Sequence, residues 1–540
     1  MRTGVASRER FTFWDFCSGA TQATRPAHGS RTQYVRYGQL APCTTLRCMV
    51  ASCADFLETA GMTRPNILLI IADGMQAEAV DPGHACLTPS LDALAQRGVR
   101  FRRAHTTCPT CSPARASLLT GMLPHNHGVL EVEHGRDDDQ CVLRTEYPHF
   151  AQKLSDAGYR TGYFGKWHVE RSQEVSRFGW QESVVKGAAH VKNIGKGDQG
   201  PETFTLDEAL CGYIEGPRGY RRILHWGVTD TPIDERYPGL TVLDAEKFLS
   251  EKLTGDNPWC CCVSFSEPNE ALVVGRDTWD RYDPTEIPLP DNFFDDMSDR
   301  PNMYQREQAI GRSLSEDHWR AARAAYFGRI TEVDSLVRRL VDQVESTGQL
   351  QNTVVVFVAD HGRYIGAHGY DAHNFGAFEE IYRVPLIVSG PNVASDAECN
   401  AHVSLADLGA TICELGDTSP FACADSSSFQ SLLKEPDTVP AGFETGYAEY
   451  HGTRFPLMQR VLWQGDWKFI FNGFDFDELY NLHEDPAETY NRIRDPEQQT
   501  RVDSMMAEIW RRVRDTGDRA ILESHYFSMR FAAVGPDTVS

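Results

Sequence analysis

The chain has 540 residues, of which 41% are hydrophobic and 24% are charged, an ordinary composition for a globular protein with one large or two medium domains. Its formal net charge of −23 at pH 7 argues against nucleic acid or an anionic membrane surface as the main partner, because like charges repel. No run of about 18 apolar residues occurs, so we predict no membrane-spanning segment.

The first 61 residues differ from the rest of the chain in composition. They are rich in arginine, contain no lysine and lack the apolar segment of a secretory signal. We interpret residues 1–61 as a disordered extension or a mis-assigned start, with an arginine-rich transit peptide as the alternative. The fifteen cysteines, including the run Cys260–Cys262, show no spacing typical of a disulfide framework or a zinc site. Reduced thiols and a cytoplasmic location are therefore predicted.

Continuous apolar runs between turn residues predict strands that are buried on both faces, as in a parallel sheet. In chain order, the predicted elements are a strand at 67–72, a helix from Pro89 that closes at Gly98, a helix over 150–158, strands at 159–164 and 259–265, a helix over 326–344, and strands at 354–359 and 384–388. This alternation predicts an α/β fold, with a large, mostly parallel sheet sandwiched by helices. Ligands of such sheets bind beyond the carboxyl ends of the strands. Because Asp73, Lys166 and Asp360 follow predicted strands, we expect them to converge there.

Two later regions have a different character. Residues 275–312 are rich in Asp, Pro and Asn and show little periodicity, which predicts a long surface insertion. Residues 460–471 predict a hairpin that turns at 464–466, followed by a strand near 477–482 and a final helix near 499–515. This pattern indicates a smaller C-terminal α+β unit that contains an antiparallel sheet.

The segment from Cys111 to Gly121 carries the most specific motif. It reads Cys-Ser-Pro-Ala-Arg followed by Ala-Ser-Leu-Leu-Thr-Gly, which places a cysteine before a proline turn at the apparent start of a helix. Free backbone N–H groups at a helix start favour negative charge. The segment resembles the C-x-P-x-R signature of the type I sulfatases with its L-T-G tail. Residues 165–168 and 360–362 resemble the G-K-W-H and D-H-G motifs of the same family.

The resemblance covers about residues 64–515 and implies a member of the alkaline-phosphatase-like superfamily. It implies a catalytic domain over 62–435 and a smaller C-terminal subdomain over 436–540. In this family the signature cysteine is oxidised to formylglycine by a formylglycine-generating enzyme, and the aldehyde hydrate attacks the sulfur of a sulfate ester. Formylglycine at Cys111 is therefore implied.

The resemblance also implies a divalent metal ion held by Asp73, Cys111, Asp360 and His361. Family members commonly carry two adjacent aspartates after the first strand, whereas Gly74 follows Asp73 here. The family favours Ca²⁺, but the missing carboxylate and the imidazole ligand leave Mn²⁺ or Mg²⁺ open.

Further roles follow from the same resemblance: Arg115 holds the hydrate and the metal shell, Asp360 is the base, Lys166 binds a sulfate oxygen, and His168 takes the proton whose loss releases sulfate. Asn269 and His373 stand where relatives carry His and Lys. We expect His373 to be the leaving-group acid, with a pKa near neutrality. Asn269 is expected to bind a sulfate oxygen or a substrate hydroxyl.

These residues predict a sulfatase that acts on a small-molecule or carbohydrate sulfate ester. Sugar sulfates are favoured over small aryl sulfates, because the insertion at 275–312 could shape a larger pocket. One alternative is a phosphonate monoester or phosphodiester hydrolase, which uses the same nucleophile and a single aspartate after the first strand. Another is a catalytically silent relative that binds sulfated ligands, motivated by Gly74, Asn269 and His373. The sequence leaves the oligomeric state undetermined.

Overall fold

The computed structural model describes residues 64–135, 142–186, 205–216, 218–253, 255–371, 373–422, 425–453, 456–522 and 531–538. Thr63–Ser540 form one compact unit. The predicted extension at 1–61 lies outside the described residues.

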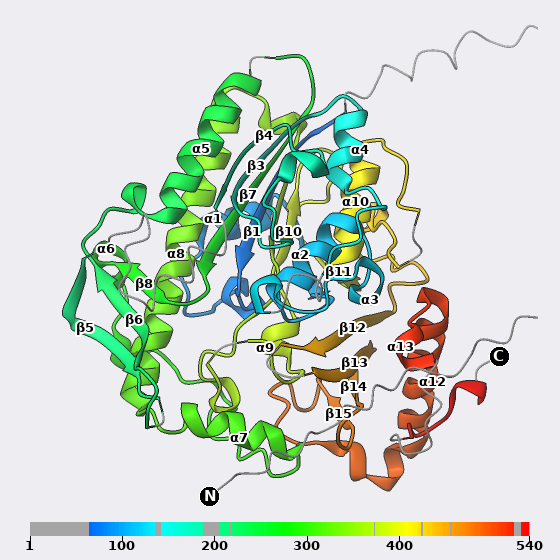
Figure 1. The fold of residues 1–540 in the computed structure, drawn as a ribbon. Coiled ribbons are helices and arrows are strands. Elements are labelled where there is room, and N and C mark those ends of the chain that lie inside the picture. Colours follow the sequence, from blue (N-terminus) through cyan, green and yellow to red (C-terminus); the bar gives the residue numbers. More distant parts are fainter. Residues whose placement is uncertain are drawn as a thin grey trace, which may run out of the picture. The chain divides into compact units, whose positions relative to one another are not determined.

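Eight strands form the main sheet. Their spatial order is β11 (Ala397–Ser404), β2 (Gly98–His105), β10 (Leu386–Ser389), β9 (Thr353–Ala359), β1 (Asn66–Asp73), β7 (Trp259–Pro268), β3 (Arg160–Lys166) and β4 (Glu182–Lys186). Neighbouring strands pair in parallel, except that β10 is antiparallel to both β9 and β2. The predicted α/β fold with a large, mostly parallel sheet is confirmed (Figure 1).

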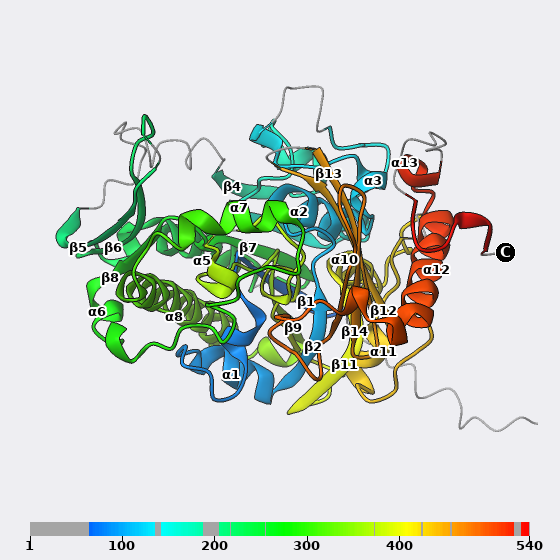
Figure 2. The same ribbon diagram turned by 90° about the horizontal axis from the view of Figure 1, so that it is seen from below.

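Helices cover both faces of this sheet, which explains why the central strands are apolar on both sides. On one face lie α1 (Pro89–Gln96), α5 (Tyr237–Lys252) and α8 (Glu316–Ser346), and on the other lie α2 (Cys111–Thr120), α4 (Phe150–Asp156) and α10 (Leu405–Leu415) (Figure 2). Side chains of β1, β7 and β9 form the centre of the core; those of Ile67, Leu68, Cys261 and Val356 have no exposed surface. The three consecutive cysteines of β7 are therefore buried core thiols.

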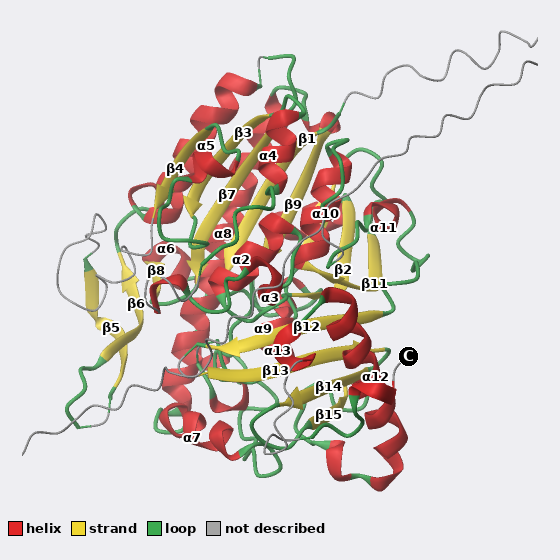
Figure 3. Cartoon of the chain, turned by 45° about the vertical axis from the view of Figure 1, so that its right-hand side comes forward, coloured by secondary structure: helices red, strands yellow, loops and turns green. Residues whose placement is uncertain are grey.

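Two smaller sheets flank the main one (Figure 3). One is β5 (Leu206–Ile214), β6 (Ile223–Thr229) and β8 (Leu272–Gly275); the other, antiparallel throughout, is β12 (Thr445–Gly452), β13 (Pro456–Gln464), β14 (Trp467–Asn472) and β15 (Glu478–Asn481). The remaining helices are α3 (Pro124–His127), α6 (Arg276–Trp279), α7 (Asn302–Gly311), α9 (Glu379–Tyr382), α11 (Gln430–Lys434), α12 (Gln499–Thr516) and α13 (Arg519–Leu522). The antiparallel sheet and the helix after it were predicted. The domain boundary at 435/436 stays a prediction.

Residues 275–312 match the predicted surface insertion in part: residues 280–301 contain no α-helix or strand and many of them are exposed, but the flanking parts are ordered. The segment contains α6 and α7, and the side chains of Trp279, Met297 and Tyr304 are buried. These widely spaced apolar residues anchor the segment without the regular periodicity of a long helix. Among the described residues, no helix combines the length and the apolar character needed to cross a membrane.

Candidate active site

Four neighbouring strands bring the candidate residues to one edge of the main sheet. β9, β1, β7 and β3 are adjacent and parallel, so their carboxyl ends meet. Asp73 ends β1 and Lys166 ends β3, while Asp360 follows β9 and Asn269 follows β7. The strand pattern predicted that Asp73, Lys166 and Asp360 converge, and the structure brings them together.

Helix α2 supplies the other part of the cluster. Cys111 is its first residue, after the extended Thr110, and Gly121 ends the helix in the left-handed conformation with φ 66°. Arg115 lies one turn after Cys111, so both side chains face the same edge of the sheet. The Cys111 side chain is 3% exposed, and its Sγ atom lies 3.1 Å from Nε2 of His361 and 3.9 Å from Oδ1 of Asp73.

The side chains of Asp73, Cys111, Asp360 and His361 form a candidate metal site. Each offers one ligand atom, all four side chains are buried, and the four atoms lie within 4.8 Å of one another. Two carboxylates, one imidazole and an oxygen at position 111 would suit a hard or borderline divalent cation. The donor set therefore fits the predicted metal ion.

Two buried cations balance the two carboxylates of this cluster. Arg115 donates from Nε to Oδ2 of Asp360 at 2.7 Å and from Nη2 to Oδ2 of Asp73 at 3.0 Å, and Lys166 also contacts Oδ2 of Asp73. Although burial opposes the charge on Asp73, Lys166 and Arg115 hold the pKa of Asp73 well below its usual value. Burial and the Asp73 charge raise the pKa of the Cys111 thiol well above its usual value. Burial thus disfavours the thiolate, which is the nucleophilic form, for the side chain encoded at position 111.

Asn269 and His373 lie next to each other at one side of the cluster, and His373 lines a cavity. Asn269 donates from Nδ2 to Oδ1 of Asp73 at 2.5 Å and lies 3.4 Å from Nε2 of His373, whose ring stacks on that of His361 with 3.9 Å between centroids. The Nδ1 atom of His373 is 3.3 Å from the carbonyl of Pro109, which only accepts hydrogen bonds. This contact favours the tautomer with the proton on Nδ1. The near-neutral pKa predicted for His373 is wrong: burial, assisted by His361, lowers that pKa to about 3.

His168 points toward a second group of side chains. Its backbone has φ 53°, and its Nε2 atom lies 3.0 Å from Nδ1 of His134 and 3.8 Å from Oε1 of Glu133. Burial and the nearby Lys166 lower the pKa of His168 well below its usual value. In the part of the chain that the structure describes, no hydrogen bond joins His168 to Cys111 or Asp73. His168 thus lies beside the cluster rather than in it.

Two residues of the site were not predicted from the sequence. Ser264, in β7, accepts a hydrogen bond from Nη1 of Arg115 at 2.7 Å. Arg363, which is 1% exposed in its side chain, donates from Nη1 to Oδ1 of Asn269 at 2.8 Å and also pairs with Asp371. The position of Arg363 directly after the Asp-His-Gly motif was a usable signal for it. Nothing in the sequence around Ser264 marks that residue.

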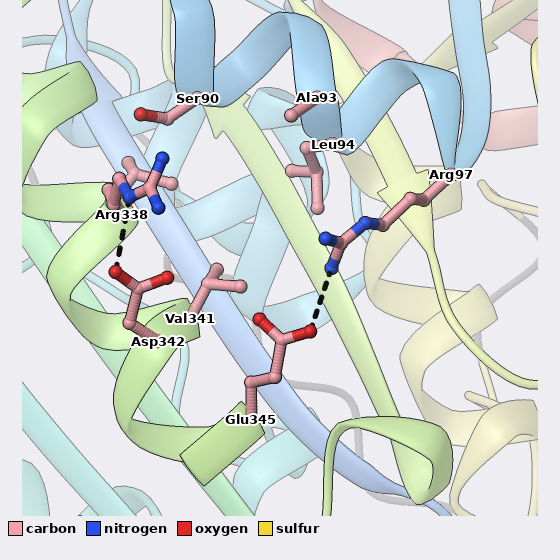
Figure 4. Close-up of a pocket in the computed structure, with 9 residues that line it drawn as sticks. Ser90, Ala93, Leu94, Arg97, Arg338, Val341, Asp342 and Glu345 are labelled. Atoms are coloured by element: carbon pink, nitrogen blue, oxygen red, sulfur yellow. Dashed lines mark hydrogen bonds and ion pairs between the residues drawn. The ribbon is translucent and has the colours of Figure 1, made fainter.

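Two cavities differ in their relation to the cluster. One of about 500 Å³ has His373 and Arg363 in its lining. Another, of about 90 Å³, lies between α1 and α8 and contains the ion pairs Arg338–Asp342 and Arg97–Glu345 (Figure 4). None of the candidate site residues lines the smaller cavity, so it is not part of the site.

Known proteins are similar to this chain in sequence and in fold. The family model described as Sulfatase matches residues 65–418. The chain is 29% identical over 467 residues to a choline-sulfatase of Rhizobium meliloti (strain 1021), covering 80% of this chain and 83% of the relative. It is 25% identical over 468 residues to an arylsulfatase of Clostridium perfringens (strain 13 / Type A), covering 82% and 92%.

Solved structures show the same fold. A phosphonate monoester hydrolase of Agrobacterium radiobacter superposes with a TM-score of 0.69 at 21% identity, covering 83% of this chain and 95% of that one. A protein solved with its substrate D-glucosamine-2-N,6-O-disulfate superposes with a TM-score of 0.68 at 19% identity, covering 86% and 100%. Since the family model spans most of the chain, the protein belongs to the sulfatase family and is a sulfuric ester hydrolase.

Proposed function

We propose that this protein hydrolyses a sulfate monoester with a formylglycine made from Cys111 as nucleophile, at a divalent metal ion held by Asp73, position 111, Asp360 and His361. The supporting observation is the buried group of four ligand atoms within 4.8 Å, flanked by Arg115 and Lys166. The maturation partner would be a formylglycine-generating enzyme.

The two proposed groups would supply different chemistry. The metal, with Ca²⁺ favoured and Mn²⁺ or Mg²⁺ as alternatives, would supply positive charge for sulfate oxygens and acidity for a hydroxyl at position 111. Formylglycine would supply, as its hydrate, one hydroxyl to serve as the nucleophile toward sulfur and a second hydroxyl whose deprotonation would allow sulfate to leave.

The remaining roles belong to side chains of this chain. Arg115 fixes the orientations of Asp73 and Asp360 through its forked guanidinium. The ammonium group of Lys166 contacts the carboxylate of Asp73, which is one of the proposed metal ligands. A sulfate bound at the metal would therefore lie near this ammonium group, which is the proposed donor to a sulfate oxygen. Asp360 is the proposed base near position 111, and His168 the proposed acceptor of the second hydroxyl proton. His168 must turn from His134 to act in this way.

Proton delivery to the leaving oxygen is assigned to His373. The tautomer favoured by the Pro109 contact leaves Nε2 of His373 without a proton, and the low pKa keeps the ring neutral. The negative charge of a bound sulfate ester near this ring would favour protonation of Nε2, since a neighbouring negative charge raises the pKa of a histidine. Asn269 is held by Asp73 and Arg363 so that its amide faces the same region.

A phosphonate monoester or phosphodiester hydrolase is the second candidate function. It is favoured by the single aspartate at the end of β1, where Gly74 follows Asp73, and by the shared fold with a phosphonate monoester hydrolase.

A sugar sulfate was favoured from the length of residues 275–312, but only Ile310 and Gly311 of that segment line the cavity beside His373. The insertion therefore does not support the preference for sugars. The cytoplasmic location stays a prediction.

The test compares kcat/KM for an aryl sulfate, an aryl phosphonate monoester and an aryl phosphodiester. Protein from a host with a formylglycine-generating enzyme is first examined by mass spectrometry of the peptide containing residue 111, in which oxygen should replace sulfur with the loss of two hydrogens. We expect the sulfate to be hydrolysed fastest, a chelator to abolish turnover, and added Ca²⁺ or Mn²⁺ to restore it. Faster hydrolysis of the phosphonate or diester would select the second candidate. If formylglycine is confirmed but none of the three esters is hydrolysed, the result supports the alternative of a catalytically silent relative that binds sulfated ligands.

A further inference from the structure

The larger cavity lies beside the candidate metal site, with His373 between the two. His373 is part of its lining, and the His373 ring stacks on His361, whose Nε2 atom is 3.1 Å from Sγ of Cys111. The volume is about 500 Å³, within the range of small-molecule sites. A group bonded to a sulfate that lies at the cluster would therefore extend past His373 into this cavity.

The buried part of the cavity lining is aromatic and aliphatic. It comes from the end of β5, from β6, from the turn before α8 and the first turn of α8, and from the segment after β9, elements that Figure 1 locates. Seven of the lining side chains are apolar or aromatic and buried or half-buried: Ile214, Leu224, Leu314, Trp319, Tyr364, Tyr370 and Phe375. Such walls favour an apolar ligand through the hydrophobic effect.

The polar atoms of these aromatic walls are already bonded within the protein. The hydroxyl of Tyr364 donates to the carbonyl of Phe375 at 2.5 Å, and that of Tyr370 donates to the carbonyl of Tyr304 at 2.6 Å. Nε1 of Trp319 donates to the carbonyl of Gly311 at 3.1 Å. Sugar hydroxyls that lose water need protein partners in return. These walls present aromatic rings to a ligand, and not free hydrogen-bonding groups for sugar hydroxyls.

The charged groups around Arg363 are bonded within the protein in the same way. Arg363 bonds to Glu270 at 2.5 Å and to both carboxylate oxygens of Asp371 at 2.8 and 2.9 Å. Asp371 also lies 2.8 Å from Nε2 of His225. Across the lining, three carboxylates (Glu215, Glu270, Asp371) face two guanidiniums (Arg221, Arg363), so the formal balance is negative. A second sulfate or a carboxylate on the substrate would be repelled.

The open side of the cavity carries exposed apolar side chains. Tyr220, Ile223 and Ile310 are 77%, 63% and 45% exposed, and all three line the cavity. Apolar side chains gathered at a cavity mouth are typical of a site that covers an apolar ligand.

We propose that the cavity binds the organic part of the substrate and that this part is an uncharged, apolar alcohol or phenol. The natural substrate is then a monosulfate with a hydrophobic alkyl or aryl group, not a polysulfated or carboxylated sugar. The proposal rests on the sulfatase function and names the substrate class of that site.

The test measures kcat/KM for a series of n-alkyl sulfates below their micelle concentrations, for an aryl sulfate and for D-glucosamine-2-N,6-O-disulfate. Each added methylene should raise kcat/KM about fourfold until the cavity is filled, as expected for burial of apolar surface. The disulfated sugar should be the poorest substrate. A flat dependence on chain length, or a preference for the disulfated sugar, would overturn the proposal.

Variants at the mouth give a matched comparison. Ile310→Ala should lower kcat/KM for octyl sulfate about threefold, and Ile310→Arg about tenfold, while the arginine improves use of the disulfated sugar. Leu240 has a similar exposure of 39% but lies on α5, outside the cavity lining. Leu240→Ala and Leu240→Arg should leave both substrates unchanged. Equal effects at the two positions would contradict the assignment.

The two proposals can fail separately. If protein with verified formylglycine hydrolyses no sulfate ester, the proposed function fails, and calorimetric titration with ethyl and octyl sulfate then tests the cavity alone. Tighter binding of octyl sulfate that Ile310→Arg weakens would support the apolar site. Equal dissociation constants for the two sulfates would overturn it.

Discussion

Arg115 holds together the charge balance of the candidate site. Its guanidinium bridges Asp73 and Asp360 and also donates to Ser264 and to the carbonyl of Lys166. With a side chain 2% exposed, it is shielded from water, so its contacts act at low effective dielectric. Removing one partner from a buried ion network leaves uncompensated charge, which costs more than the network contributes as a whole.

We therefore predict that Arg115→Met lowers the free energy of unfolding by about 3–5 kcal/mol and reduces kcat/KM by roughly 10²-fold or more. Urea unfolding and steady-state kinetics measure the two effects. The matched control is Arg338→Met, which removes an arginine paired with Asp342 at 3.1 Å on the exposed face of α8. That loss should be within about 1 kcal/mol, with unchanged kinetics. Similar decreases in the free energy of unfolding and in kcat/KM for the two variants would contradict the prediction that the buried Arg115 network contributes more than an exposed ion pair.

The positions of the site residues could be predicted from the sequence, but their side-chain directions and pKa values could not. Asp73, Lys166 and Asp360 were predictable because strand ends are readable from apolar runs, and parallel strands align those ends. The direction of the His168 side chain depends on a backbone φ of 53°. No local sequence pattern predicts a positive φ at a residue other than glycine. The pKa of His373 depends on burial by distant segments, so the sequence indicated a titratable residue but not its low pKa.

At the scale of elements, long apolar runs were the reliable signal. The strands now seen as β1, β7 and β9 and the helix α8 were all predicted, because burial on both faces, or a long helical period, leaves a strong pattern. β2 was not predicted, since Arg100, Arg102 and Arg103 interrupt its apolar residues. The antiparallel direction of β10 is set by its connection and not by its own residues.

Helix α4 gives a prediction for the pH dependence of stability. His149, directly before this helix, is fully buried, and its ring stacks on Phe178 with 4.3 Å between centroids. Burial lowers the pKa of His149 to about 3. The ordinary histidine value is about 6.5, so between about pH 6.5 and 3 the unfolded chain binds a proton that the folded chain does not. Stability contributed by neutral His149 is therefore lost as the pH falls.

We predict that this residue alone makes the free energy of unfolding fall by about 1.4 kcal/mol per pH unit within that window. His149→Phe keeps an aromatic ring between the same neighbours but cannot be protonated, so its unfolding free energy should depend less steeply on pH. Urea unfolding from pH 7 to pH 5 measures both slopes. Identical slopes for the two proteins would exclude the contribution of His149.

At the scale of the whole molecule, a net charge of −23 opposes the approach of an anionic substrate. The cations of the site do not offset this field at long range, because Arg115 and Lys166 are paired with Asp73 and Asp360 and the two charges of the proposed metal ion are small beside the net charge. The cavity that we assign to the organic group is itself negative in its formal balance. A sulfate monoester is thus repelled until it reaches contact distance from the buried cations.

This arrangement predicts the effect of salt. Raising NaCl from about 0.01 M to 0.15 M shortens the Debye length from about 30 Å to about 8 Å, which screens the distant acidic surface but not the buried pairs at the site. KM for a monoanionic aryl sulfate should therefore fall severalfold, while kcat stays constant because the contacts at the reacting group are unchanged. Replacing NaCl by KCl controls for a specific effect of the cation. A KM that rises with salt would mean that the substrate is attracted at long range by a positive region of the surface, and the acidic surface would then not control its approach.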